Sequence, residues 1–332
     1  ELRTSTRATL VDPVAQEVEI SSGERLHYDR LLMATGAEPR RLSLPGSGLD
    51  GIHYLRTLSD ADAIRNAIAV GEPTVIIGAG WIGCEVAASA RQLGADITMV
   101  DPLSVPLERV LGPEVGRIFQ DLHQEHGVRV RCGVGVEAIR GRTQVEEVVL
   151  TDGTSVPAGT VIAGIGVLPR TELADAAAME VDNGIVTDEY LACSVPGVFA
   201  AGDVANSWYP IYGQRIRLEH WSAALNQGPV AARNMLGQQI PYDRTPFFYS
   251  DQYDLSMEYR GWVPDWDQVA LRGDPSSRQF LAFWVSKGRV AAVMNVNVWD
   301  QTEQIENLLR SGRTVDTATL ADPQIDLSEL GG

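Results

Sequence analysis

The segment 74–101 carries the pattern that most limits the possible fold of this chain. The apolar, β-branched run Thr74–Ile77 predicts a buried strand, and Gly78-Ala-Gly-Trp-Ile-Gly83 follows it directly. Apolar residues at three- and four-residue spacing then predict a helix, and a second predicted strand ends at Asp101. A strand, a glycine turn, a helix and a strand make a βαβ unit. The pattern therefore predicts a Rossmann-like nucleotide-binding domain.

The three glycines and the acidic residue each have a physical role in such a site. Gly78 permits the tight turn, Gly80 lets backbone N–H groups approach a pyrophosphate, and Gly83 lets the helix pack closely on the strand. Asp101 would accept hydrogen bonds from the adenosine ribose and repel a 2′-phosphate, so we expect NADH to be preferred over NADPH. Arg109 is the one feature that would weaken this preference, because an arginine at this place can bind a 2′-phosphate. Alternatively, Arg109 is simply a solvent-exposed arginine without a role in binding.

Turn and strand signals divide the chain into four segments. A small antiparallel element and a buried strand precede a Gly- and Pro-rich linker at 42–51, so we expect the first segment to be 1–54. The nucleotide domain then occupies 55–171. Two strands and a helix from about Ser222 to Leu236 occupy 172–240, and the aromatic-rich segment 241–332 predicts a separate α+β domain.

Composition excludes several classes of function. The formal net charge of −17 disfavours nucleic-acid and anionic-membrane partners, since both bind basic surfaces. Every apolar run is far shorter than the roughly 20 residues that a membrane-spanning helix needs, and we place the protein in the cytoplasm. The three cysteines are far apart and form no CxxC pair. His123 and His126 are explained by the helix dipole near a helix C-terminus rather than by a metal site, so we expect no metal.

Several motifs, in this order along the chain, resemble those of one enzyme family. They are Thr35-Gly-Ala-Glu-Pro-Arg40, the fingerprint 78–83 followed by Glu85, Gly164-Ile-Gly-Val-Leu-Pro169, Phe199-Ala-Ala-Gly-Asp203, Glu219-His-Trp221 and Ser250-Asp-Gln-Tyr253. Their arrangement is similar to that of FAD-dependent NADH:ferredoxin reductases of the rubredoxin and putidaredoxin type, in the pyridine nucleotide-disulfide oxidoreductase superfamily. The resemblance implies an α/β fold class with two Rossmann-like nucleotide-binding domains, for FAD and for NADH, plus a C-terminal α+β domain.

The resemblance also implies which residues contact each cofactor. For FAD they are Thr35, Gly36, Arg40, Gly202, Asp203 and Trp221, with the Asp203 carboxylate accepting a hydrogen bond from the ribityl chain. For NADH they are Gly78, Gly80, Ile82, Gly83, Glu85, Asp101, Arg109 and Gly166, with Glu85 near the nicotinamide carboxamide. The helix from about Ser222 matches one whose N-terminus faces the flavin, where its dipole favours the anionic reduced ring. We expect no catalytic side chain, since the cofactor carries the chemistry.

The chain departs from the family pattern in three respects. Tyr249 stands where a tryptophan close to the flavin and the docking face is usual, and Ala223-Ala224 replaces an Asn-Ala pair after Trp221. A scan of the sequence finds no second strand–GxGxxG–helix element, although such an element binds the ADP half of FAD in this family. We therefore expect a FAD domain that is incomplete at its N-terminus.

The resemblance implies an enzyme that passes electrons from NADH through FAD to a [2Fe–2S] ferredoxin serving an oxygenase or a cytochrome P450. Two alternatives stay open: a pyridine nucleotide-disulfide reductase or NADH oxidase with its redox cysteine upstream, and a non-catalytic NADH-binding scaffold. Since an acidic protein must still bind an acidic ferredoxin, we expect a local arginine patch near the flavin. Its candidates are Arg40, Arg41, Arg289 and Arg313.

Overall fold

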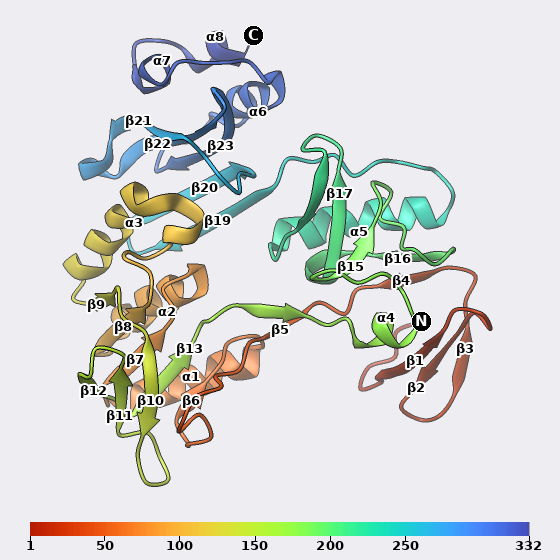
Figure 1. Ribbon diagram of the computed structural model, residues 1–332, viewed down its shortest axis with the longest axis horizontal. Helices are drawn as coiled ribbons and strands as arrows, with labels where there is room; N and C mark the ends of the chain where they lie inside the picture. Colours follow the sequence, from red (N-terminus) through yellow and green to blue (C-terminus); the bar gives the residue numbers. More distant parts are fainter. Residues whose placement is uncertain (332) are drawn as a thin grey trace. The chain divides into compact units, whose positions relative to one another are not determined.

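The computed structural model describes residues 1–331, which fall into two compact units (Figure 1). Unit 1 consists of residues 1–38 and 168–248, and unit 2 consists of residues 39–167 and the chain from 249 onward. The chain passes from one unit to the other within three strands, which are β5 (Ala37–Pro39), β14 (Val167–Pro169) and β19 (Phe247–Gln252). Unit 2 thus contains both the segment that carries the glycine fingerprint and the C-terminal segment.

A five-stranded parallel sheet with the order β6-β13-β7-β8-β9 forms the centre of unit 2. Its strands are β6 (Ile52–His53), β7 (Thr74–Ile77), β8 (Ile97–Asp101), β9 (Arg129–Cys132) and β13 (Thr160–Ala163). The helices that accompany it are α1 (Leu58–Ala69), α2 (Trp81–Gln92) and α3 (Glu108–Glu125). Every residue of β7 and β13 is buried, because a parallel sheet is covered on both faces. The predicted βαβ unit is confirmed as β7, α2 and β8.

An antiparallel sheet, β10-β11-β12, shares its core with this parallel sheet. Its strands are β10 (Val136–Arg140), β11 (Glu147–Leu150) and β12 (Ser155–Pro157). Leu42, Leu44 and Leu49 pack against the same core. The sequence pattern assigns this stretch to the first segment, 1–54, whereas in the structure residues from 39 on belong to unit 2, because the leucines bury their side chains on the nucleotide-domain core.

The C-terminal part of unit 2 is a second sheet, with the order β19-β20-β23-β22-β21, packed by short helices. Besides β19, the strands of this sheet are β20 (Leu255–Gly261), β21 (Gln268–Asp274), β22 (Gln279–Ser286) and β23 (Arg289–Val296). Its helices are η2 (Pro275–Ser277), α6 (Thr302–Ser311), α7 (Thr317–Ala321) and α8 (Leu327–Gly331). Phe283, Val293, Leu308 and Leu320 lie in its core, which confirms the expected α+β composition. The expectation of a separate domain over 241–332 is not met, because residues from 249 on belong to unit 2 together with the nucleotide segment.

Two tryptophans join the C-terminal domain to α3, which lies beside the blue strands in Figure 1. Trp284 is fully buried, and its Nε1–H donates a hydrogen bond of 3.1 Å to the carbonyl oxygen of Leu111. Gly112, with a φ of +79°, kinks α3 just before Pro113. A Cβ at Gly112 would lie 2.9 Å from the ring of Trp266, so the kink makes room for that ring.

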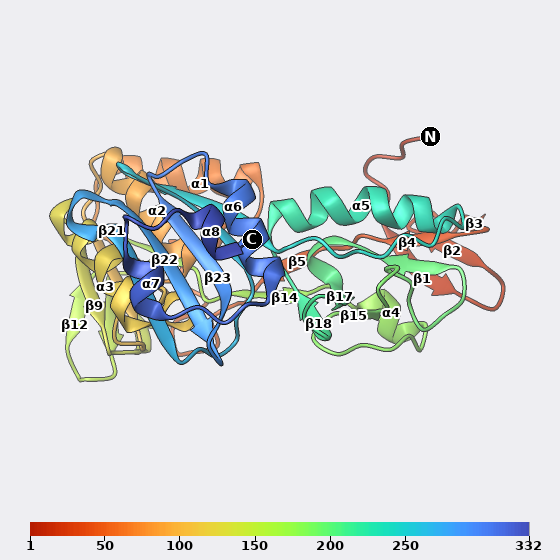
Figure 2. The same cartoon turned by 90° about the horizontal axis from the view of Figure 1, so that it is seen from above.

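Unit 1 contains three small sheets, β1-β2-β3, β16-β4 and β15-β17-β18. The strands are β1 (Ala8–Asp12), β2 (Glu17–Ile20), β3 (Arg25–His27), β4 (Leu31–Met33), β15 (Ile185–Thr187), β16 (Val198–Ala200), β17 (Ala205–Tyr209) and β18 (Gln214–Arg217). The helices are α4 (Glu172–Ala176), η1 (Gly202–Val204) and α5 (Trp221–Met235). Helix α5 packs on β4 and β16, and its course beside β4 can be followed in Figure 2. Met33, Val198 and Val204 lie in the core of this unit.

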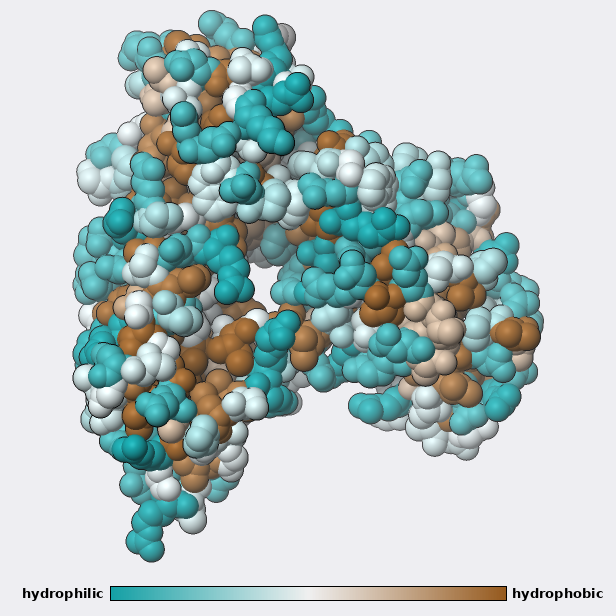
Figure 3. All heavy atoms as spheres, viewed as in Figure 1, coloured by the Kyte–Doolittle hydropathy of each residue, from teal (hydrophilic) through white to brown (hydrophobic). Residues whose placement is uncertain are grey.

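The surfaces of both units are largely hydrophilic in the view of Figure 3, in keeping with the formal net charge of −17. Every helix among residues 1–331 is too short or too polar to cross a membrane. Trp221 and Tyr249, both expected near the flavin, are among the large exposed side chains, at 67% and 55% exposure.

Candidate functional site

The glycine loop between β7 and α2 leaves room for an anion at one position only. Gly78 has a φ of +102°, and a Cβ there would lie 2.4 Å from the carbonyl oxygen of Gly164. A Cβ on Gly83 would lie 1.9 Å from the carbonyl oxygen of Gly78. A Cβ on Gly80, the N-cap of α2, would meet no atom within 4 Å. The approach to the first turn of α2 is therefore open at Gly80, as a pyrophosphate requires.

Asp101 supports this loop from the end of β8. Its Oδ2 accepts a hydrogen bond of 2.7 Å from the Ala79 N–H, and its Oδ1 accepts one of 2.8 Å from the Leu103 N–H. Sequence reasoning missed this structural role, in which the carboxylate holds the glycine loop in place. Each oxygen keeps a second lone pair for a ribose hydroxyl. Ile82 and Arg109 lie exposed in the first turns of α2 and α3.

Gly166 and Arg40 lie next to each other in unit 2. The Arg40 N–H donates a hydrogen bond of 2.9 Å to the carbonyl oxygen of Gly166. Gly166 has a φ of +95°, and Cδ and Nε of Arg40 lie 3.7 Å from the place of a Cβ on that glycine. The structure thus brings together one residue expected at FAD and one expected at NADH.

Glu85 connects α2 with the Ser-Asp-Gln-Tyr motif at the start of the C-terminal domain. The Ser250 hydroxyl donates a hydrogen bond of 2.7 Å to Glu85 Oε1. Burial raises the pKa of Glu85, the Ser250 hydrogen bond opposes this rise, and the charge of Asp251 adds to it. The Glu85 side chain is therefore held in one orientation by a residue of the other domain.

The Phe199-Ala-Ala-Gly-Asp203 motif forms the end of β16 and the turn η1. Gly202 has a φ of +78°, and the atom nearest to a Cβ there would be Cβ of Ala224, at 3.5 Å. The Gly202 N–H donates a hydrogen bond of 2.7 Å to Oε1 of the buried Gln227, which ties the turn to α5. The carbonyl oxygen of Asp203 accepts a hydrogen bond of 3.2 Å from Arg217. The backbone at Asp203 is therefore fixed beside α5.

Thr35 and Gly36 follow β4, which pairs in parallel with β16. The Thr35 hydroxyl donates a hydrogen bond of 2.7 Å to the carbonyl oxygen of Arg170, and the Arg170 N–H donates one of 2.9 Å to the carbonyl oxygen of Gly36. Because parallel strands end at the same edge, Thr35 and Gly36 lie at the edge of unit 1 that also carries the Gly202–Asp203 turn.

The N-terminus of α5 provides the test of whether unit 1 fits a flavin. His220, its N-cap residue, makes no side-chain capping bond, and its ring lies 4.4 Å from that of Phe248. Burial lowers the pKa of His220 to about 4, opposed by the charge of Asp203. Within residues 1–331 its buried Nδ1 has no hydrogen-bond partner. Such an atom is rare, and together with an uncapped helix N-terminus it fits a polar ring such as flavin.

His123 and His126 lie at the C-terminal end of α3, where each contacts a residue of the Ser-Asp-Gln-Tyr motif. In the part of the chain that the structure describes, no group of three or more His, Cys, Asp or Glu residues is placed to hold a metal ion. Burial lowers the pKa of His123 to about 4, which favours burial over the helix dipole as the explanation of this residue. Its Nε2 instead lies 3.0 Å from Oε1 of Gln252. The sequence signal for the burial of His123 was its position on the apolar face of α3, next to Leu122.

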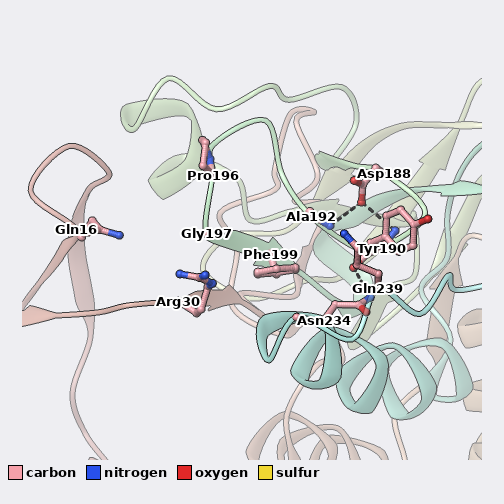
Figure 4. A pocket seen from close by; sticks show the side chains of 11 residues that line it. Gln16, Arg30, Asp188, Tyr190, Ala192, Pro196, Gly197, Phe199, Asn234 and Gln239 are labelled. Carbon is pink, nitrogen blue, oxygen red and sulfur yellow. Dashed lines mark hydrogen bonds between the residues drawn. The ribbon is translucent and has the colours of Figure 1, made fainter.

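Unit 1 also contains a cavity of about 450 Å³, lined by Gln16, Arg30, several residues within 188–199 and several within 234–239 (Figure 4). None of the expected FAD residues lines it. Its polar groups are largely paired: Asp188 accepts hydrogen bonds from the Tyr190 and Ala192 N–H groups, and the Asn234 amide donates to the carbonyl oxygen of Tyr190. These side chains serve to hold the surrounding loops.

Two family models match this chain. Residues 1–228 match the model described as pyridine nucleotide-disulphide oxidoreductase, and residues 247–331 match the model described as reductase C-terminal. The ferredoxin–NAD(+) reductase component of the anthranilate 1,2-dioxygenase system from Burkholderia cepacia is 38% identical over 327 residues, which cover 98% of this chain and 80% of that protein.

Solved structures of ferredoxin reductases are similar over almost all of this chain. The ferredoxin reductase for the CYP199A2 system from Rhodopseudomonas palustris has a TM-score of 0.94 at 33% identity, covering 99% of this chain and 81% of that one. Putidaredoxin reductase in its covalent complex with putidaredoxin has a TM-score of 0.92 at 36% identity, covering 98% of this chain and 79% of that one. The chain therefore belongs to the pyridine nucleotide-disulphide oxidoreductase family, as a ferredoxin reductase of the kind found in dioxygenase and P450 systems.

Proposed function

We propose that this protein binds FAD and NADH and passes electrons from NADH through FAD to a [2Fe–2S] ferredoxin that serves an oxygenase or a cytochrome P450. The glycine loop is the observation that carries this proposal, since Gly80 opens the start of α2 while a side chain at Gly78 or Gly83 would clash with backbone. When bound, FAD would couple NADH, which donates two electrons together, to an iron–sulfur acceptor, which takes one electron at a time.

At the site proposed for NADH, some residues would form hydrogen bonds to the nucleotide, and the glycines would let it approach the backbone. The first turn of α2, reached past Gly80, attracts the pyrophosphate. Asp101 accepts hydrogen bonds from the adenosine ribose and repels a 2′-phosphate, with exposed Arg109 as the group that would weaken this preference. Glu85 Oε1 is taken by Ser250, which leaves Oε2 to accept an N–H of the nicotinamide carboxamide. Gly166 offers a surface without a side chain.

On the FAD side, the residues are those expected from the family resemblance. Asp203 accepts a hydrogen bond from a ribityl hydroxyl, which Gly202 lets come close. His220 Nδ1 gains the partner that it lacks within residues 1–331. Thr35 and Gly36 complete the set within unit 1, with Trp221 as an exposed aromatic group. Arg40 and the exposed Tyr249 belong to unit 2, and their roles near the flavin rest on the family resemblance.

For the ferredoxin, we propose arginines as the docking charges. Arg289 pairs with Thr314 across a β-bridge, which places it near Arg313. The guanidinium of Arg41 lies 4.2 Å from the centre of the Tyr54 ring, one residue from Arg40. Reversal of charge at Arg41 and Arg289 should weaken ferredoxin binding and leave NADH-to-ferricyanide turnover intact. Unchanged affinity for ferredoxin would eliminate the arginine patch.

All three cysteines have thiol pKa values that burial raises. Burial raises the pKa of Cys84 well above its usual value, and it raises the pKa of Cys132 and of Cys193 to about 12. A redox cysteine needs a thiolate near neutral pH, and all three are free thiols in the structure. None of the three is therefore suited to a redox role. Because the disulfide and oxidase alternative places its redox cysteine upstream, stimulation by ferredoxin is what distinguishes it from this proposal.

One experiment tests the proposal as a whole. The visible spectrum of the purified protein should show a flavin band that NADH bleaches, and a [2Fe–2S] ferredoxin should greatly accelerate the oxidation of NADH. NADPH in place of NADH, and cytochrome c without ferredoxin, are the matched controls. Absence of the flavin band would contradict FAD binding. Bleaching without stimulation by ferredoxin would contradict the proposed acceptor and favour an oxidase.

A further inference from the structure

Five polar side chains form a continuous hydrogen-bonded chain inside unit 2, from α2 through β19 to α3. Ser250 Oγ lies 2.7 Å from Glu85 Oε1, and Gln252 Nε2 lies 3.1 Å from Ser250 Oγ. Gln252 Oε1 lies 3.0 Å from His123 Nε2, and the Tyr253 hydroxyl lies 3.3 Å from His123 Nδ1. Ser250, Gln252 and His123 are at most 1% exposed, so water does not replace these bonds.

The alternation of side chains along β19 produces this arrangement. Ser250 and Gln252 point to the buried face and Asp251 points to solvent, as expected for a strand with one face covered. Tyr253 then adopts a φ of +58°, which turns the chain after β19. Its ring stacks on that of His126, with 3.7 Å between ring centres and 9° between planes. The Ser-Asp-Gln-Tyr motif thus contributes three of the five side chains.

An ionised Glu85 fixes the direction of every bond in the chain. A carboxylate only accepts, so Ser250 must donate to it and must itself accept from the Gln252 amide NH₂. The amide oxygen of Gln252 then faces His123 and requires a proton on Nε2. A neutral imidazole has one ring proton, so Nδ1 is bare and accepts from the Tyr253 hydroxyl.

The surroundings keep His123 neutral. Burial lowers its pKa to about 4, the bond to Gln252 opposes this shift, and His126 adds to it. The titratable and charged groups that act on the chain are Asp251 of the C-terminal domain, Cys84 and Arg91 of α2, and His126 of α3. Beyond His126 lie Asp254 and its partner Arg278. Because His123 carries no charge at pH 7, its influence on Glu85 depends on which ring nitrogen holds the proton.

We propose that His123 is a positioning residue for Glu85: its Nε2–H tautomer, transmitted by Gln252 and Ser250, holds the carboxylate as an acceptor for the nicotinamide carboxamide. This inference rests on the proposed binding of NADH at Glu85. The chain orients and polarises the carboxylate, since aligned hydrogen bonds strengthen one another. It does not conduct protons, because the amide of Gln252 has no proton to release at neutral pH.

The first test reads the tautomer directly, in the protein without NADH. Proton–nitrogen correlation of the histidine rings at pH 7 should show His123 protonated on Nε2 and bare on Nδ1, with the signal assigned by its loss in His123→Gln. In Ser250→Ala the Gln252 amide loses its acceptor, and we expect a mixture of both tautomers. An Nδ1–H tautomer in the unaltered protein, or an unmixed Nε2–H tautomer in Ser250→Ala, overturns the proposal.

The second test is kinetic, with ferricyanide as acceptor. His123→Leu removes the donor to Gln252 and should raise the KM for NADH about tenfold while kcat changes less than about twofold. His123→Gln supplies an amide N–H in place of Nε2–H and should restore most of this loss. Tyr253→Phe removes only the hydrogen bond at the far end of the chain and should raise KM less than His123→Leu does.

The outcomes separate this inference from the proposed function. If His123→Gln is as impaired as His123→Leu, or if Tyr253→Phe raises KM as much, the positioning role is overturned while NADH oxidation by the unaltered protein still stands. If the unaltered protein does not oxidise NADH, the proposed function fails, and the tautomer measurement still decides whether the chain has the direction inferred here.

Discussion

Substitution of Gly80 with alanine tests whether the open space at the start of α2 binds the pyrophosphate of NADH. Gly80 has a φ of −77° and a ψ of −174°, which alanine adopts without strain, and a new Cβ would meet no atom within 4 Å. As an N-cap substitution the change costs below about 1 kcal/mol of stability. We therefore expect Gly80→Ala to fold normally.

The expected effect is on binding. A methyl group at Gly80 stands between the backbone N–H groups of α2 and an approaching pyrophosphate. A hydrogen bond to a charged group contributes about 1.5–3 kcal/mol. Since every 1.4 kcal/mol is about tenfold in affinity, the loss of one such bond predicts a KM for NADH that is roughly 10- to 100-fold higher.

The assay is steady-state oxidation of NADH with ferricyanide, together with the thermal midpoint of unfolding. Gly83→Ala is the matched control, because its Cβ would lie 1.9 Å from the carbonyl oxygen of Gly78 and must displace α2. We expect Gly83→Ala to lower the thermal midpoint as well as NADH binding, whereas Gly80→Ala affects binding alone. A normally folded Gly80→Ala protein with unchanged KM for NADH would refute the assignment of the loop.

Three further predictions concern charge, packing and pH. Asp101→Asn removes the carboxylate charge, and the ratio of kcat/KM for NADH to that for NADPH should fall about tenfold; an unchanged ratio means that another group sets the preference. Trp284→Phe leaves the buried carbonyl of Leu111 unpaired and should lower the free energy of unfolding by about 1–3 kcal/mol in urea titrations. Because folding lowers the pKa of His123 from 6.5 to about 4, stability should fall as pH drops from 6.5 to 4, by roughly 3 kcal/mol from this group, and no further below that range. His123→Gln should remove that part of the pH dependence, as denaturant midpoints at pH 7 and pH 5 will check.

The nucleotide fingerprint could be predicted from the sequence because its constraints are local. Gly83 must lack a side chain because the carbonyl oxygen of Gly78, five residues earlier, lies where its Cβ would be. The leucines at 42, 44 and 49 could not be placed in the same way. Their Gly- and Pro-rich surroundings indicate a linker, and the core they cover is built by residues that lie between Val75 and Val161. Packing partners that far away in the sequence leave no periodic signal.

His123 shows the same limit at the candidate site. Helical periodicity places it on the buried face of α3, and alternation along β19 places Gln252 on a buried face. Neither pattern indicates that these two faces meet, since the two residues are 129 positions apart. The dipole explanation used only the neighbours of His123 in sequence, and burial against another domain decided its protonation instead.

The contacts between the nucleotide domain and the C-terminal domain imply a second role for the latter. Arg278 pairs with Glu125 of α3 and with Asp254, and Trp284 donates to the backbone of α3. Without the C-terminal domain, Glu85 would lose the Ser250 bond and His123 would lose its Gln252 partner. Each buried polar group left unpaired costs about 1–3 kcal/mol. A change in how this domain packs on α3 should therefore alter the site proposed for NADH.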